Sequence, residues 1–253
     1  MCIRDRYGIK RDEQRAFALA TVAVENAPEA ERVWIEDNRR RVDELSGGKL
    51  AYVWIPDTGG EGYAAFLRGY FAQQDKHGAV IDERYNHGGS IADLMVDVMN
   101  RKLLGYFNNP VGARQPFTAP NAAIWGPKVL VINEMAGSGG DMLPYMFRKL
   151  GIGPLVGTRT WGGLVGIWDV PGLIDGGFIT APRGGFYDTE GKWAVEGEGV
   201  APDIEVEQTP AAAREGRDLQ LEAAVHAALE LLPDAAIELL PQPADPVRSR
   251  RPQ

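Results

Sequence analysis

A serine between glycines, in residues 133–141, has the residue types and spacing that acyl-transfer chemistry needs. The segment reads Asn-Glu-Met-Ala-Gly-Ser-Gly-Gly-Asp and follows an apolar run typical of a buried strand. A serine at a corner between strand and helix projects its hydroxyl clear of the sheet, beside the helix N-terminus and the N–H of the next residue. Ser138 therefore resembles the serine of a nucleophile elbow, although Ala136 replaces the first glycine of G-x-S-x-G. The alternative is a glycine-serine loop that only caps the helix.

A second glycine-containing turn could stabilise the negative charge that such chemistry creates. Residues 82–90 read Asp-Glu-Arg-Tyr-Asn-His-Gly-Gly-Ser and connect a predicted buried strand to a predicted helix. Glycines at a helix N-terminus present free backbone N–H groups, which can bind a phosphate or an oxyanion. Gly88 and Gly89 are the candidates. The alternative is a turn that needs glycine conformations for geometry alone.

Glycine is concentrated between Gly151 and Gly199, where two segments combine it with tryptophan. They are residues 157–166 and residues 193–203. Such backbone can pack closely against something flat or extended, such as a peptide. The alternative is a pair of surface turns, each anchored by its tryptophan.

Strands and helices that alternate along the chain must position these segments. The pattern predicts strands at 50–55, 79–82 and 128–133, and helices at 63–74, from Ser90, through 142–150 and at 220–232. The helix from Ser90 is the clearest, with Ser90 as N-cap, Asp93 three residues on, and an apolar stripe of Ile91, Leu94, Met95, Val98 and Met99. Alternating strands and helices predict an α/β fold.

Both ends of the chain differ from this pattern. Residues 17–24 read as a strand, and Asn26, Pro28 and Glu29 as a linker. Residues 1–6 resemble a translated sequencing adapter, so we expect the natural protein to extend upstream. Residues 233–253 are rich in proline, and we expect a loose tail.

Composition excludes several classes of protein. The 253 residues carry a formal charge of −8, which argues against nucleic-acid binding. The single cysteine, Cys2, cannot form an internal disulfide or a thiolate metal cluster, and we expect no metal and no cofactor. No apolar run approaches the ~20 residues of a membrane helix, and the first residues lack the apolar core of a signal peptide.

Taken together, the four glycine-containing segments resemble the tricorn-type serine peptidases, relatives of the carboxy-terminal processing proteases. The resemblance covers about residues 35 to 232 and includes residues 42–48 and 53–58. It implies a crotonase-like or Clp-protease-like β/α spiral domain, preceded in the full protein by other domains that end with a PDZ domain. The predicted strand at 17–24 then looks like the end of that PDZ domain. The expected division is 1–31 for the start, PDZ remnant and linker, 32–232 for the catalytic subdomain, and 233–253 for the tail.

The resemblance also implies roles for individual residues. Ser138 matches the nucleophile, and the N–H of Gly139 matches one oxyanion donor. The second donor comes from the turn at Gly88 and Gly89, with Gly89 preferred. Glu196 matches the carboxylate that, in this family, steadies a second serine and through it the catalytic histidine. These roles suit the chemistry, because a serine needs a base and its tetrahedral oxyanion needs two donors.

The family's catalytic histidine lies upstream of the PDZ domain, and the three histidines here are poor substitutes. His226 falls in an amphipathic helix, and His77 ends a helix, where a cation is favourable. His87, in the predicted oxyanion turn, is the one with a potential role. A Ser-Lys dyad is not expected, since residues 160–163 hold no lysine. This chain alone is therefore expected to be inactive or nearly so.

Three alternatives stay open. One is a crotonase-like acyl-CoA enzyme that uses Gly89 and Gly139, and a second is an α/β-hydrolase with Ser138, Asp203 and His226. The third is a domain that binds peptides without cleaving them. The resemblance implies peptide substrates, a homo-oligomer of the full-length protein, and the cytoplasm, with the periplasm also open. Substrate preference is not predicted, because Asn108 and Asn109 are not acidic where some relatives select basic side chains.

Overall fold

The computed structural model describes residues 13–109, 111, 116–167, 171–233 and 240–244, with side chains in the first helix described from Glu29 onward. The unusual start at residues 1–6, with Cys2, and most of the tail at 233–253 lie outside these residues. The chain divides into two compact units, residues 1–41 and residues 42–253. The second unit contains all the residues predicted to form the site.

The second unit is built on a five-stranded sheet in which every neighbouring pair of strands is parallel. Its order is β1 (Leu50–Trp54), β2 (Gly78–Asp82), β5 (Lys128–Ile132), β6 (Leu155–Gly157) and β7 (Ile204–Glu205). A short antiparallel pair, β3 (Gly105–Phe107) and β4 (Phe117–Ala119), stands apart and was not predicted. The α/β fold class is confirmed, with a parallel main sheet.

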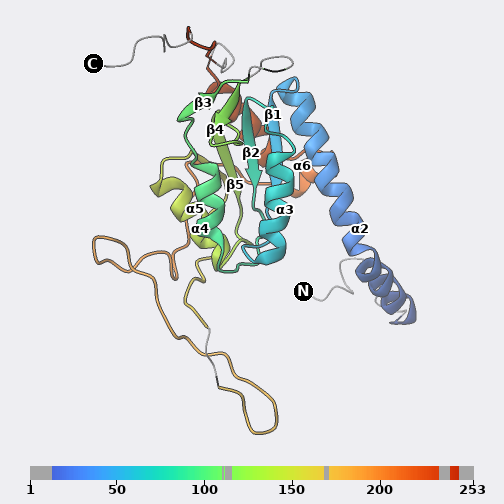
Figure 1. Ribbon diagram of the computed structural model, residues 1–253. Coiled ribbons are helices and arrows are strands. Elements are labelled where there is room, and N and C mark those ends of the chain that lie inside the picture. Colours follow the sequence, from blue (N-terminus) through green and yellow to red (C-terminus); the bar gives the residue numbers. More distant parts are fainter. Residues whose placement is uncertain (1–12, 110, 112–115, 168–170, 234–239, 245–253) are drawn as a thin grey trace. The chain divides into compact units, whose positions relative to one another are not determined.

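Helices cover both faces of this sheet, as connections between parallel strands require. Figure 1 shows α3 (Gly60–Phe71), α4 (Ala92–Met99) and α5 (Gly139–Lys149) together on one face. On that face the core includes Phe66, Tyr70, Met95, Leu143 and Phe147, packed with Val53, Ile81, Leu130 and Ile132 of the strands. The helix α7 (Leu219–Glu230) contacts β2, β5 and β6, and the short α6 (Pro210–Arg214) precedes it. Both faces of the central strands are thus buried, which explains their continuous apolar sequences.

The strand predicted at residues 17–24 is wrong, because these residues lie in the helix α2 (Glu13–Ser46). The predicted linker around Asn26 and Pro28 lies in the same helix. A short apolar run does not by itself distinguish strand from helix. Here alanine, the best helix former, recurs through the segment, and the charged sequence after it supports a helix, with Glu36 paired to Arg39. The interpretation as the end of a PDZ domain therefore loses its basis.

The helix predicted from Ser90 exists, but its predicted cap is wrong. It begins at Ala92, with Ile91 at the N-cap position and no side-chain capping bond. The backbone of Thr58 forms the local hydrogen bonds instead: its N–H donates to Gly88 O at 2.9 Å, and its carbonyl accepts from Ile91 N at 2.8 Å. The turn before α4 is thus held by a neighbouring loop, which local sequence does not reveal.

Candidate active site

The loops that follow β1, β2, β5 and β6 meet at the carboxyl edge of the parallel sheet. This edge is where α/β proteins with open sheets bind their ligands. Residues 55–59, 83–91, 133–138 and 158–166 come together there, and they include most of the predicted site residues.

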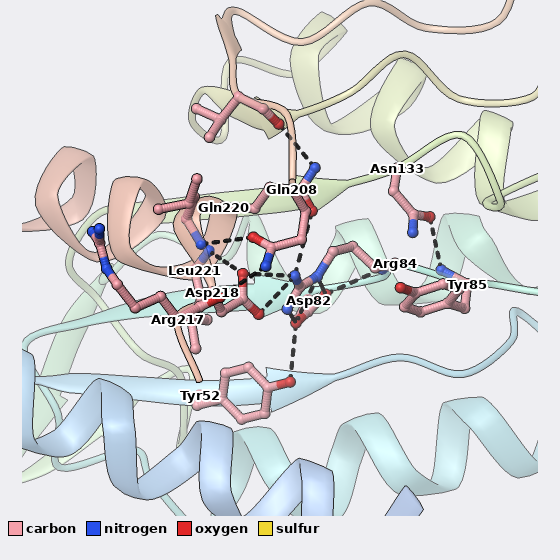
Figure 2. Close-up of polar contacts among 12 residues, drawn as sticks. Tyr52, Asp82, Arg84, Tyr85, Asn133, Gln208, Arg217, Asp218, Gln220 and Leu221 are labelled. Atoms are coloured by element: carbon pink, nitrogen blue, oxygen red, sulfur yellow. Dashed lines mark hydrogen bonds and ion pairs between the residues drawn. The ribbon is translucent and has the colours of Figure 1, made fainter. Parts of the chain in front are cut away.

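A buried ion-pair network fixes the start of the loop that contains Gly88 and Gly89 (Figure 2). Asp82, the last residue of β2, is fully buried and accepts hydrogen bonds from Arg84 and from the Tyr52 hydroxyl, at 2.6 and 3.0 Å. Arg84 also donates at 2.9 Å to Asp218, whose side chain caps α7 through Leu221 N. Because Asp82 is fully buried, removing Arg84 would leave its carboxylate without this cationic partner, whereas Arg84 is also paired with Asp218. The network therefore anchors the loop to the sheet and to α7.

Asparagines join this loop to the one that carries Ser138. The side chain of Asn133 accepts from Tyr85 N at 2.9 Å, a contact that Figure 2 shows. The carbonyl of Asn86 accepts from Gly137 N at 3.1 Å, and its side-chain oxygen accepts from Gly88 N at 2.8 Å. The two glycine-containing turns are consequently held in one position relative to each other.

Ser138 occupies the corner between β5 and α5 in a backbone conformation that is rare for residues with a side chain. Its φ is 57° and its ψ is −114°. Strain of this kind persists only where surrounding contacts enforce it, and it concentrates at functional sites. The sequence predicted such a corner, and the structure has it at this residue.

The turn at Gly88 and Gly89 lies directly against this corner. A Cβ atom on Gly88 would stand 2.7 Å from Ser138 Cβ and 3.1 Å from its Oγ. A Cβ on Gly139 would stand 2.4 Å from Gly89 O and 2.8 Å from Gly89 N. Only glycine permits these approaches, so the backbones of both predicted oxyanion segments can reach the serine.

Asp141 organises the Ser138 corner, a role that the sequence analysis missed. Its buried carboxylate accepts four hydrogen bonds. The donors are Ser138 N at 2.7 Å, Thr160 Oγ1 at 2.6 Å, Gly162 N at 2.8 Å and Gly163 N at 3.1 Å. Its place three residues after Ser138, at a helix start, matches a capping pattern and could have drawn attention to it.

A pocket of about 720 Å³ opens beside Ser138 and has mostly apolar walls. Its lining includes Gly89, Gly139, Met142, Met146, Leu164, Val165, Ile167 and Phe186. The exposed Glu196 supports one wall, since its carboxylate accepts from Leu164 N at 2.6 Å and Val165 N at 2.5 Å. Glu196 thus lies next to the predicted site. Its carboxylate accepts hydrogen bonds from backbone N–H groups and not from another described side chain.

The histidines lie elsewhere, and none of the three lines this pocket. His226 is exposed on α7, with Nδ1 3.4 Å from Glu230 Oε1. Asp203 pairs with Arg148 and accepts from Leu155 N, at the amino end of β6, opposite the edge that holds Ser138. The arrangement does not bring Ser138, Asp203 and His226 together as an α/β-hydrolase would require. His87 is exposed and donates its backbone N–H to Pro56 O.

A buried acid, Glu83, lies beneath the site. It is fully buried, one oxygen accepts from Asn86 Nδ2 at 3.2 Å, and the other has no hydrogen-bond partner in the described structure. Burial, together with the nearby carboxylates of Asp141 and Asp82, raises the pKa of Glu83 well above its usual value. The carboxyl group is therefore neutral in the folded protein over a range where it ionises in the unfolded chain.

The difference between the pKa of Glu83 in the folded protein and in the unfolded chain predicts how the free energy of unfolding depends on pH. The contribution of Glu83 is fully present below its unfolded pKa and is lost as the pH rises through the folded pKa, because the unfolded state then releases a proton that the folded state retains. We expect Glu83→Gln to remove this component, so that the free energy of unfolding falls less between mildly acidic and mildly alkaline pH than in the wild type. Urea titrations across this range measure it. Parallel pH profiles for the two proteins would contradict the assignment.

Comparisons with known proteins agree with this geometry. Residues 49–206 match the model of peptidase family S41. Tricorn protease from Thermoplasma acidophilum is 39% identical over 201 residues, which cover 79% of this chain and 19% of the relative. Tricorn protease homolog 1 from Streptomyces coelicolor is 40% identical over 215 residues, covering 85% and 20%. The crystal structure of the tricorn protease superposes with a TM-score of 0.75 at 39% identity, over 79% of this chain and 20% of that one.

The described residues form a parallel α/β sheet with a serine corner at its carboxyl edge. The chain belongs to peptidase family S41, and its resemblance to the tricorn-type peptidases is confirmed. It spans about a fifth of the length of the curated relatives that it matches.

Proposed function

We propose that this chain carries the nucleophile of a serine peptidase, which cleaves peptides through an acyl-enzyme on Ser138. The main support for this proposal is the strained backbone corner at Ser138, which is held by Asp141 and packed against the turn at Gly88 and Gly89. Family membership supports the reaction class.

In the proposed first step, Ser138 Oγ attacks the carbonyl carbon of the scissile peptide bond while a base takes the hydroxyl proton. The backbone N–H groups of Gly139 and Gly89 stabilise the oxyanion of the tetrahedral intermediate. The intermediate then collapses, the C–N bond breaks, and the protonated base gives its proton to the leaving amine. Water repeats the sequence to release the acyl group and restore Ser138. We propose that a segment outside this chain supplies the base, since none of the three histidines lines the pocket.

A fluorophosphonate probe tests the nucleophile. We expect it to label Ser138 in the full-length peptidase, and to label the isolated 253-residue chain slowly or not at all, because an unactivated serine is a weak nucleophile. Peptide mapping by mass spectrometry locates the adduct. A full-length protein that cleaves peptides without labelling at Ser138 would overturn the assignment, and peptide binding without turnover in any form would favour the non-catalytic alternative.

Glu196 has a measurable role in this proposal. Because its carboxylate holds two backbone N–H groups of the pocket wall, we expect Glu196→Ala to lower kcat/KM of the full-length peptidase by about tenfold. Its side chain is exposed, so the melting temperature should change little. Steady-state assays with a fluorogenic peptide measure the loss. Glu190→Ala is the matched control, since Glu190 pairs with Lys192 in an exposed turn of the same region and does not line the pocket. Equal losses of kcat/KM in both variants would contradict the proposed role of Glu196.

The finer aspects of the interpretation rest on the same family relationship. We propose that the parallel sheet with its helices is a crotonase-like β/α spiral. We also propose that the complete protein forms a homo-oligomer in the cytoplasm. No helix in the described part of the chain has the length and apolar character needed to cross a membrane.

A further inference from the structure

A second pocket lies at the opposite edge of the sheet from Ser138. It has a volume of about 350 Å³ and is lined by residues 99–103, 125–128 and Ile152. Lys128 is the first residue of β5, whereas Ser138 follows the end of that strand. At about 3.3 Å per residue, the five residues of β5 keep the two pockets apart by more than a hydrogen-bonding distance. The second pocket is thus separate from the proposed active site.

Three cationic side chains line this pocket: Arg101, Lys102 and Lys128. Its lining contains no aspartate or glutamate, and no ion pair between the three cations and a carboxylate occurs within the described residues. The chain as a whole carries a charge of −8, so this local excess of positive charge runs against its composition. A concentration of one charge sign in a cleft attracts ions of the other sign.

Lys128 is the most unusual of the three. Only 4% of its surface is exposed, and its Nζ donates a hydrogen bond to the carbonyl of Gly126 at 2.9 Å. An ammonium group has three N–H donors, and a buried charge is costly unless it is paired. The Gly126 carbonyl accepts from only one of the three N–H donors of Lys128, and it is neutral, so it does not balance the positive charge.

The other two cations line the same pocket as Lys128. Arg101 donates to the carbonyl of Ala122 at 3.1 Å, and its guanidinium lies 5.6 Å from the centre of the Phe71 ring. These contacts fix the side chain in advance, which reduces the entropy lost on binding. Lys102 is exposed and adds positive charge near Lys128.

We propose that this pocket binds a small oxyanion, a phosphate or a carboxylate, through Lys128 with the support of Arg101 and Lys102. The anion would accept the hydrogen bonds of Lys128 that the protein leaves unmade, and it would supply the missing negative charge. Charge-assisted bonds of this kind are stronger than neutral ones. The volume suits a small ligand, or the anionic end of a larger one.

The pocket also predicts that binding depends on pH. Burial, aided by the positive charge of Lys102, lowers the pKa of Lys128 to about 8. A bound anion favours the charged amine, so anion affinity should fall as the pH rises through this value. The groups that face Lys128 across the pocket are Arg101 and Lys102, both cationic, and neither reverses this sign.

Isothermal titration calorimetry of the 253-residue chain tests the proposal, at constant ionic strength set with chloride. Inorganic phosphate and acetate are titrated separately, so the two arms distinguish the ligand types. We expect saturable binding of at least one anion. The pH dependence is measured with acetate, whose charge is constant in this range, and its affinity should fall between about pH 7 and about pH 9 as Lys128 loses its proton. No saturable binding of either anion, or an acetate affinity independent of pH, would overturn the proposal.

Variants locate the site. Lys128→Met keeps the length and apolar stem of the side chain, and it should weaken binding about tenfold or more and abolish the pH dependence. Lys102→Met, at an exposed position that should not disturb folding, should weaken binding by about two- to fivefold. Lys149→Met is the control, because Lys149 is exposed and lies over Tyr145, outside the pocket. Equal affinities in Lys102→Met and Lys149→Met would place the anion elsewhere.

Discussion

Replacing Ser138 with alanine should lower kcat of the full-length peptidase by about 10⁴-fold or more, since the members of such a catalytic group act as a unit and loss of the nucleophile removes the acyl-enzyme route. The fold should be unaffected, because alanine, like serine, has a Cβ atom and meets the same backbone strain at this position, and the bond from the residue-138 N–H to Asp141 does not use the hydroxyl. Fluorogenic peptide assays measure the activity, and thermal unfolding measures the fold.

A matched variant separates this effect from a general loss of a hydroxyl group. Thr118→Ala removes a hydroxyl group on β4 that donates to Asn121 O, and Thr118 does not line the pocket. It should keep activity close to that of the wild type. If Ser138→Ala retains more than a small fraction of activity while Thr118→Ala behaves normally, Ser138 is not the nucleophile.

Replacing Asp141 with asparagine should have the largest effect on stability. Asp141 is fully buried and accepts four hydrogen bonds from donors in two loops. An amide has one accepting oxygen, and its NH2 group would face N–H donors that have no other partner in the described structure. We expect a loss of about 3 kcal/mol in the free energy of unfolding. In urea titrations the midpoint should fall without a large change in slope.

Asp188→Asn provides the comparison for this substitution. Asp188 also accepts backbone N–H bonds, from Glu190 and Lys192, but it does so in an exposed turn where water can replace the lost contacts. Its effect should be much smaller. A similar midpoint shift for both variants would mean that the burial of Asp141 does not explain its contribution to the free energy of unfolding.

The Asp141 variant should also lose activity in the full-length peptidase, because Ser138 and residues 160–163 would no longer be held together.

The pattern of strands and helices was predictable to a large extent. Strands β1, β2 and β5 and helices α3, α4, α5 and α7 appear within a few residues of their predicted positions. The strands have short continuous apolar runs, and the helices have apolar residues at helical spacing. The short strands β6 and β7 have three and two residues, too few for a periodic signal. The prediction of a strand at residues 17–24 was wrong for a related reason, since a short run rich in alanine and valine suits both a strand and a helix.

The site was predictable only in part. Ser138 and the glycines at 88, 89 and 139 were predicted because their residue types and their place at a strand end carry a local signal, and the structure brings them together. Asp141 was missed although it stands close to Ser138, since three of its four donors come from residues 160–163. Glu83 was missed because a charged side chain in a loop reads as exposed, and only packing shows that it is buried.

The sequence by itself determined the α/β class, the serine at a strand-to-helix corner and the family, because each depends on residue types at short spacings. The tertiary structure alone decided which segments meet: the turn at Gly88 and Gly89 against Ser138, and Glu196 against Leu164 and Val165. It also decided that Lys128 stands in a pocket with two other cations. The physical reason is that these contacts join residues far apart in the chain, whereas propensity and periodicity act over a few residues only.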